Sequence, residues 1–327
     1  MSLDLIALAE QAWNGELDTV FEHHPVHTVY QGSCELADDL LGLKSIAALF
    51  VIDTGDGLVM LDASLQLDID RIFEEVRSWR PNTPLSAAIF SHHHVDHVFA
   101  TRRFEEEARQ RGWPQPVVYA HELTPQHFDR YRNTLGWNTA INRRQFAIDA
   151  PQFSWPSEYR YPDVLYKDRL TFKRGRLTFE LHHARGETDD HTWTYIPERK
   201  ILIPGDLFIW AVPNAGNPQK VQRYLSDWAD ALNQMAGLEP ELMLPGHGLP
   251  IFGADRVHEA LTNTAAVLRS IEEQTLALMN RGCSLDQVMH QVKLPMDLFD
   301  KPYLRPVYDD PHFLIRMVWR RYGGWWD

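Results

Sequence analysis

The chain is poor in cysteine, with only Cys34 and Cys283 among 327 residues. Two thiols so far apart in sequence are too few for a disulfide framework or a cysteine metal cluster, so both are expected to be free. No apolar run reaches the roughly 18 residues that a membrane helix requires. Residues 1–14 read as an acidic amphipathic helix without the basic region and cleavage site of a signal peptide. These absences predict a cytoplasmic protein with no membrane span.

Positive charge is also scarce, since 32 lysines and arginines stand against 45 aspartates and glutamates, a net charge of -13. A protein that binds nucleic acid or an anionic membrane needs a basic patch, and the sequence contains none, so neither partner is expected. The apolar share of 44% and the charged share of 24% are typical of a globular protein. An anionic small-molecule substrate would have to be attracted locally, by metals and individual arginines.

The sequence does contain a histidine-rich segment, SHHHVDH, at residues 91–97, directly after an apolar run that resembles a buried strand. Alternate residues of extended backbone point the same way, so His92 and His94 can bind one ion together. Asp96 and His97 can then bind a neighbouring ion. Such ligands suit zinc, and iron or manganese also accept them. The plain alternative is a solvated loop, but a tag-like cluster would lie at a terminus and would not include an aspartate. The segment predicts a site for two divalent metal ions.

The periodicity along the chain predicts two sheets surrounded by helices. Strands are expected within residues 46–63, where a glycine turn separates two of them, and at 84–91, 116–120, 169–183, 193–204 and 241–248. Helices are expected at 66–80, 98–112 and 219–235. Strands that alternate with helices on a two-sheet core predict the α+β class.

Two segments depart from this alternation. Residues 125–166 are rich in aromatic residues, asparagine and arginine without clear periodicity, which is typical of a substrate-facing insertion. From residue 253 onward the pattern becomes helical, with a long helix to residue 280, a short one at 284–292 and an arginine- and aromatic-rich one at the end. The sequence therefore predicts a catalytic domain at 1–252 and a helical extension at 253–327.

Two ions need more than four ligands, and the ends of later strands are where further ligands are expected. Asp206, in IPGDL, could bridge the two ions with its carboxylate. His247, in LPGHG, could complete the set of the second ion. A glycine next to aspartate or histidine often marks only a turn. The order of the two motifs and their positions at strand ends nevertheless favour metal ligands.

Taken in order, HxHxDH, GD and PGHG resemble the metallo-β-lactamase superfamily over residues 46–253. The resemblance implies an αβ/βα sandwich of two sheets with flanking helices. In most of that superfamily the third ligand of the first ion is a histidine in a PGHT segment, whereas the corresponding stretch here reads ARGETDDH. Glu187 stands at the ligand position. This replacement is similar to the alkylsulfatase branch and implies that Glu187, rather than His191 or His183, completes the first site.

Other segments of the chain also resemble alkylsulfatases. The strand PERKILIPGD is similar to the branch's P-E-x-K strand, whose following acidic residue bridges the metals, which implies that role for Asp206. The segments EQTLALMNRGCSLDQVMHQVKLP and IRMVWRRYGGWWD resemble the helical dimerisation segment of alkylsulfatases and imply a homodimer. The bridging residue differs, being aspartate rather than glutamate. The sequence also ends at Asp327, where those enzymes continue into a sterol-carrier-like domain, so a small or moderate organic group is expected on the substrate.

The expected reaction is hydrolysis of a sulfuric ester by a metal-bound hydroxide that Asp96 or Asp206 orients. Arg143 and Asn142, in the insertion, are expected to contact the substrate, because a guanidinium matches a tetrahedral oxyanion. His191 could also contact substrate or could instead lie behind the metal ligands. Attack at sulfur and attack at carbon both stay open. A lactonase, thioesterase or phosphodiesterase on the same fold is the alternative, and a non-catalytic metal-binding protein is the third hypothesis.

Overall fold

The computed structural model of the protein describes residues 4–17, 31–216 and 220–324. Its first sheet has seven strands in chain order. They are β1 (Gly32–Ala37), β2 (Leu40–Lys44), β3 (Ala48–Asp53), β4 (Leu58–Leu61), β5 (Leu85–Ile89), β6 (Val117–His121) and β7 (Val164–Tyr166). The strands β1 to β4 pair antiparallel, and β4 to β7 pair parallel.

The second sheet has six strands in the order β13-β12-β11-β10-β9-β8. They are β8 (Arg169–Arg174), β9 (Leu177–Ala184), β10 (His191–Ile196), β11 (Ile201–Ile209), β12 (Leu242–His247) and β13 (Ile251–Phe252). Only β11 and β12 pair parallel in this sheet. The two parallel strands therefore end at the same edge, and each carries a predicted metal ligand near that end.

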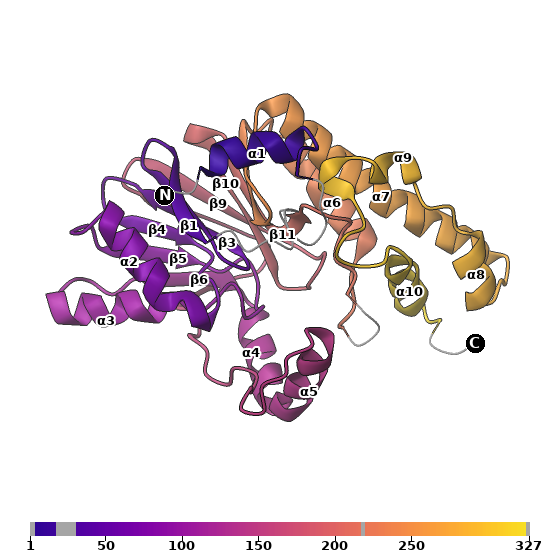
Figure 1. Cartoon of the computed structure of the whole chain (residues 1–327), viewed down its shortest axis with the longest axis horizontal. Coiled ribbons are helices and arrows are strands. Elements are labelled where there is room, and N and C mark those ends of the chain that lie inside the picture. The colour runs from indigo at the N-terminus through magenta and orange to yellow at the C-terminus, as the bar shows by residue number, and fades with distance from the viewer. Residues whose placement is uncertain (1–3, 18–30, 217–219, 325–327) are drawn as a thin grey trace.

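Helices cover the outer faces of the two sheets, as Figure 1 shows. The helices α2 (Ile69–Trp79) and α3 (Thr101–Arg111) lie against the first sheet, and α6 (Leu225–Ala236) and α7 (Ala254–Asn280) lie against the second. The remaining helical elements are α1 (Leu5–Trp13), α4 (Thr124–Asn133), α5 (Leu135–Gln145), α8 (Leu285–Gln291), α9 (Met296–Phe299), α10 (His312–Arg321) and the 3-10 turns at 66–68, 197–199 and 302–304. This arrangement agrees with the predicted α+β sandwich and its helical C-terminal segment.

The strand β3 shows why the sequence folds into layers. Its apolar run is buried on both faces. Phe50 and Ile52 face the core between the two sheets, whereas Leu49 and Val51 face the second core, beneath α2 and α3. Successive side chains of a strand point to opposite faces, so a continuous apolar run indicates a strand that is covered on both sides. The inter-sheet core continues into α6, α7 and α10.

The insertion at 125–166 has no clear periodicity in the sequence, yet its first half is helical. The structure places α4 and α5 there. The apolar residues of helix α5 form almost no amphipathic pattern, and its asparagine side chains bind their own helix. The Asn138 side chain donates to the Thr134 carbonyl at 3.1 Å, and that of Asn142 donates to the Asn138 carbonyl at 2.9 Å. The hairpin of β1 and β2 was also missed. No helix among the described residues is long and apolar enough to cross a membrane.

Candidate metal centre

The predicted ligands all lie at the ends of strands, where the two sheets approach each other. The segment 92–97 follows β5, and Glu187 follows β9. Asp206 lies within β11, and His247 is the last residue of β12. The parallel pairing of β11 with β12 and the packing between the sheets bring these four segments to one edge of the sandwich. The structure thus brings together all seven side chains that the sequence singled out as ligands.

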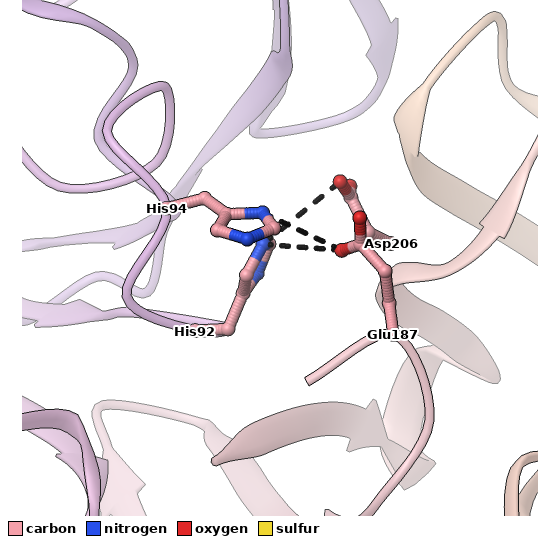
Figure 2. A group of neighbouring side chains, drawn as sticks. All are labelled: His92, His94, Glu187 and Asp206. Carbon is pink, nitrogen blue, oxygen red and sulfur yellow. Dashed lines mark ion pairs between the residues drawn. The ribbon is translucent and has the colours of Figure 1, made fainter. Parts of the chain in front are cut away.

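The first group comprises His92, His94, Glu187 and Asp206, each of which offers a ligand atom to a common point (Figure 2). The Glu187 Oε2 atom lies 3.5 Å from His92 Nε2 and 3.5 Å from His94 Nδ1. The Asp206 Oδ2 atom lies 3.9 Å from His92 Nε2. Two ligand atoms that are each about 2.1 Å from a tetrahedral ion lie about 3.4 Å apart. These spacings fit an ion between the side chains.

The second group comprises Asp96, His97 and His247. The His247 Nε2 atom lies 3.2 Å from Asp96 Oδ2, and His97 Nε2 lies 3.6 Å from the same oxygen. Asp206 reaches this group as well, since its Oδ1 lies 3.6 Å from His97 Nε2 and its Oδ2 lies 3.2 Å from His247 Nε2. Asp206 is therefore the one carboxylate that faces both groups, as a bridging ligand would.

Several atoms in the two groups are buried without a hydrogen-bond partner. They are His92 Nε2, His97 Nε2, Glu187 Oε2 and Asp206 Oδ1. A buried polar atom without a partner costs free energy comparable to a lost hydrogen bond, so native structures rarely contain it. Here the atoms converge on two points from different strands. The donor set of imidazole nitrogens and carboxylate oxygens is the one that zinc and similar divalent ions bind, and the residues fit such ions.

The opposite nitrogen of each buried histidine is held by a hydrogen bond. His97 Nδ1 lies 2.8 Å from Asp62 Oδ2, and His92 Nδ1 lies 2.9 Å from Ser91 Oγ. The Ser91 hydroxyl donates in turn to the Asp62 carboxylate at 3.0 Å. His247 Nδ1 donates to the Ile46 carbonyl at 3.0 Å. These contacts fix the ring orientation and leave each Nε2 free to accept a metal ion.

Glu187 is held by the loop that follows β11. The Asn214 amide donates to its Oε1 at 2.6 Å, and Arg223 Nη2 lies 3.3 Å from the same oxygen. Arg223 also donates to the Glu187 carbonyl, and only 1% of its surface is exposed. Burial raises the pKa of Glu187 to about 8, against the opposing effect of Arg223. A metal ion at Oε2 would stabilise the carboxylate in this desolvated position.

Two glycines let the ligand strands approach this closely. Gly205 has φ +55°, and a Cβ atom there would lie 2.6 Å from His191 Nε2. Gly246 has an ordinary backbone conformation, but a Cβ atom there would lie 2.0 Å from Asp206 Oδ1. The glycines of the GD and GH pairs are thus required by close packing around the bridging carboxylate, and not only by turn geometry.

Sequence reasoning missed three residues next to the centre. Lys44, at the end of β2, is buried, and this burial lowers its pKa to about 8, with Asp206 as the opposing charge. Burial and the neighbouring Arg223 lower the pKa of Lys220, on which Glu187 and Asp96 also act. Burial likewise raises the pKa of the Tyr308 hydroxyl, on which the carboxylates of both metal groups act. These residues carry no local spacing signal, because each comes from a separate, distant segment.

The three residues that were expected to contact the substrate are His191, Asn142 and Arg143. His191 is fully buried, its ring stacks on His92 with centroids 4.6 Å apart, and its Nε2 lies 3.2 Å from the Pro204 carbonyl. It therefore lies behind a metal ligand, which does not fit a substrate contact. Asn142 is also buried, and its amide is bonded to the preceding helical turn, as described above. Arg143 forms no ion pair with the described residues, and its role stays a prediction.

The comparisons with known proteins agree with this geometry. Residues 45–247 match the model of the metallo-beta-lactamase superfamily. The chain belongs to that superfamily. Residues 284–327 match a second model, described as alkyl sulfatase dimerisation. The predicted resemblance to this superfamily and to alkylsulfatases, and the αβ/βα sandwich that it implied, are therefore confirmed.

The similar proteins include several alkylsulfatases. A linear primary-alkylsulfatase of Pseudomonas sp. (strain ATCC 19151) is 24% identical over 294 residues, which is 84% of this chain and 55% of that protein. An (R)-specific secondary-alkylsulfatase of Pseudomonas sp. is 26% identical over 312 residues, 86% of this chain and 46% of that protein. The solved structure of a stereoselective inverting sec-alkylsulfatase from Pseudomonas sp. has a TM-score of 0.78 at 21% identity, covering 96% of this chain and 55% of that one. The chain thus spans about half the length of these relatives.

Gly246→Ala should displace Asp206, because the new Cβ atom would lie 2.0 Å from its Oδ1. Loss of a well-placed ligand contact typically lowers metal affinity about 10- to 100-fold. The dialysed variant should therefore retain clearly less divalent metal than the unmodified protein, as measured by elemental analysis. Gly136→Ala is the matched control, because a Cβ atom at Gly136 has nothing within 4 Å. Equal metal content in the two variants would contradict the bridging position of Asp206.

Proposed function

We propose that the chain is a metal-dependent hydrolase that cleaves a sulfuric ester and holds two divalent ions, zinc in particular. The observation that carries the proposal is the ligand set itself. A fully buried glutamate, Glu187, stands beside His92 and His94, and it is similar to the alkylsulfatase pattern found in the sequence. The proposed first ion is held by His92, His94 and Glu187, and the second by Asp96, His97 and His247. Asp206, whose carboxylate faces both groups, would be shared between them.

The chemistry of such a centre is metal-assisted hydrolysis. Two divalent ions would lower the pKa of a water molecule and neutralise charge on the ester. Asp96 and Asp206, whose oxygens lie 3.2 Å from His247 Nε2, are in place to orient that water. The Ser91 hydroxyl donates to Asp62 at 3.0 Å and lies 2.9 Å from His92 Nδ1, so it is on the side of the His92 ring away from the other ligands. The water is therefore the proposed nucleophile.

The sulfate group would be bound by cations of the chain. Lys220 is the candidate that we favour over Arg143, because it lies beside the arginine that contacts Glu187: a Cβ atom at Gly216 would be 2.5 Å from Lys220 Cγ and 3.3 Å from Arg223 Nη2. The Lys220 backbone carbonyl accepts two bonds from Arg320 at 3.2 Å each, which fixes its position from the C-terminal helix α10. An ammonium at this place complements a monoanionic ester that approaches the two ions.

The function is tested with metal analysis and a substrate panel. The purified protein should contain about two divalent ions per chain, and it should release sulfate from short and medium alkyl sulfates. Lactones, thioesters and phosphodiesters form the rest of the panel. Water labelled with oxygen-18 shows which bond breaks, because the label enters sulfate on attack at sulfur and the alcohol on attack at carbon. Efficient turnover of another ester class without any sulfate release would refute the substrate assignment.

Lys220→Met should weaken sulfate binding while it preserves the fold, because a charge-assisted hydrogen bond to the substrate is lost. Such bonds contribute about 1.5 to 3 kcal/mol, which corresponds to a roughly 10- to 150-fold lower kcat/KM for the alkyl sulfate. Lys200→Met is the control, since Lys200 is exposed and paired with Glu241 at 2.8 Å. Steady-state kinetics with one alkyl sulfate compares the two. Similar kinetics in both variants would count against Lys220.

We also propose a homodimer, with the helical segment from residue 253 as the dimerising part of the chain. The match of residues 284–327 to a dimerisation model supports it. The segment carries the exposed apolar side chain of Met296, which is 63% exposed and which a second copy could cover. Light scattering at micromolar concentration should give about twice the 37.9 kDa mass of the chain. A mass equal to one chain would refute the dimer.

A further inference from the structure

His93 lies between two proposed ligands of the first ion, yet it faces away from that ion. Its side chain is fully buried. Its Nδ1 lies 2.8 Å from Asp190 Oδ1, and its Nε2 lies 3.1 Å from Arg130 Nη2. Since a guanidinium can only donate, Nε2 must accept, and Nδ1 then carries the proton that is donated to Asp190. Both ring nitrogens are therefore used in contacts outside the metal centre.

Asp190 belongs to the second ligand segment. It comes three residues after Glu187 and directly before His191, whose ring stacks on His92 with an interplanar angle of 21°. The contact between His93 and Asp190 thus joins the segment that carries His92 and His94 to the segment that carries Glu187. Three of the four proposed ligands of the first ion, His92, His94 and Glu187, lie within three residues of this one hydrogen bond.

The helix α4 binds to the same pair through one face, formed by Thr124, His127 and Arg130. The Thr124 hydroxyl donates to Asp190 Oδ2 at 2.9 Å. The His127 ring stacks on His93 with centroids 4.1 Å apart, and its Nε2 lies 2.5 Å from Asp189 Oδ1. Residues three apart in a helix lie on one side, so the three side chains meet the pair together.

A third metal ion is the obvious alternative, because ligand atoms of His93, His127 and Asp190 lie within 4.8 Å of one another. Two features oppose it. The Arg130 guanidinium lies against His93 Nε2, where it would repel a cation. The two imidazole rings also stack at an angle of 21°, face to face rather than edge-on toward a common point. The cluster is built as a hydrogen-bonded contact between chain segments.

The residue after Arg130 links this contact to the metal centre. Tyr131 is buried, and its ring lies 5.3 Å from the His93 ring. Asp96 and Arg223 are among the charges that act on its hydroxyl, whose pKa is raised by burial. Tyr131 therefore adds ring packing to the hydrogen bonds that join α4 to His93.

We propose that His93 and Asp190 are positioning residues that hold His92, His94 and Glu187 in place and dock α4 on them. Ion binding at the first site and the docking of α4 are then coupled. This inference rests on the proposed two-ion function. Outer-shell contacts of this kind typically change metal affinity about 10- to 100-fold when they are removed.

The first experiment compares Asp190→Asn with the control Glu180→Gln. Glu180 is also a carboxylate beside an imidazole, 3.6 Å from His182, on the second sheet. Zinc affinity is measured by competition with a chromogenic chelator. In Asp190→Asn one of the two ions should bind about 10- to 100-fold more weakly, and the other should change less than about twofold. The control should bind both ions as the unmodified protein does. Unchanged affinity for both ions in Asp190→Asn would overturn the proposal.

The second experiment measures hydrogen exchange of α4, residues 124–133, with zinc and after chelation. In the unmodified protein, removal of zinc should speed exchange in this helix. Thr124→Val keeps the contact between His93 and Asp190 but weakens the docking of α4. Exchange in α4 should therefore be faster with zinc bound, and zinc should bind more weakly, because the coupling acts in both directions. If circular dichroism shows that Asp190→Asn does not fold, the exchange measurements alone test the coupling. An exchange rate in α4 that is the same with and without zinc would overturn it.

The failures of the two proposals can be told apart. An unmodified protein that binds fewer than two ions would refute the proposed function, and the coupling with it. Two bound ions with an unaltered Asp190→Asn variant would refute only the positioning role. A third ion that disappears in His127→Ala would show that the cluster is a metal site instead, and would overturn the inference.

Discussion

The structure of this protein depends on a set of buried ligand atoms that face one another without hydrogen bonds. Imidazole nitrogens of His92 and His97 and carboxylate oxygens of Glu187 and Asp206 share this condition. The buried carboxylates of Glu187 and Asp206 repel each other, and unpartnered polar atoms cost free energy in a protein interior. Divalent cations between them would remove both costs. Metal binding in such a site contributes directly to folding, because the unfolded chain has no preformed site.

The ring nitrogens of His92, His97 and His247 that face away from the other ligands are already hydrogen-bonded, and these bonds fix the orientation of the three rings. Asp62 alone binds the Ser91 amide, the Ser91 hydroxyl and the His97 ring, at 2.7, 3.0 and 2.8 Å. The Ser91 hydroxyl in turn contacts His92. One carboxylate at the end of β4 therefore orients ligands of both proposed ions. The strand β4 is paired with β5, and this pairing brings Asp62 next to the ligand segment that follows β5.

The clustering of the proposed ligands could be predicted from the sequence, because metal ligation would impose short spacings at strand ends. The pattern at 92–97 is local, and the GD and PGHG pairs follow apolar strands. Lys44, Lys220 and Tyr308 could not be predicted, since each approaches the centre only through the tertiary fold. Helix α5 was missed for a different reason: its asparagines bind their own backbone and its apolar residues form no clear stripe. His191 illustrates a third limit, because spacing alone does not distinguish a residue in the cleft from one behind a ligand.

The glutamate at the third ligand position explains an otherwise isolated feature, the fully buried Arg223. A histidine ligand is neutral, whereas Glu187 brings a negative charge into a site that already holds Asp96 and Asp206. Burying a charge is costly unless a partner compensates it, and Arg223 Nη2, 3.3 Å from Glu187 Oε1, is that partner. Its remaining donors bind the carbonyls of Glu187 and Ala215, so the arginine also holds the loop at 211–216 against the ligand. That loop is bonded to the C-terminal segment through Gly216 and Asp309, at 2.7 Å. Arg223 thus links Glu187 to the loop at 211–216, and Gly216 links that loop to Asp309, the residue after Tyr308. A glutamate at the ligand position, unlike a histidine, needs this arginine as its partner.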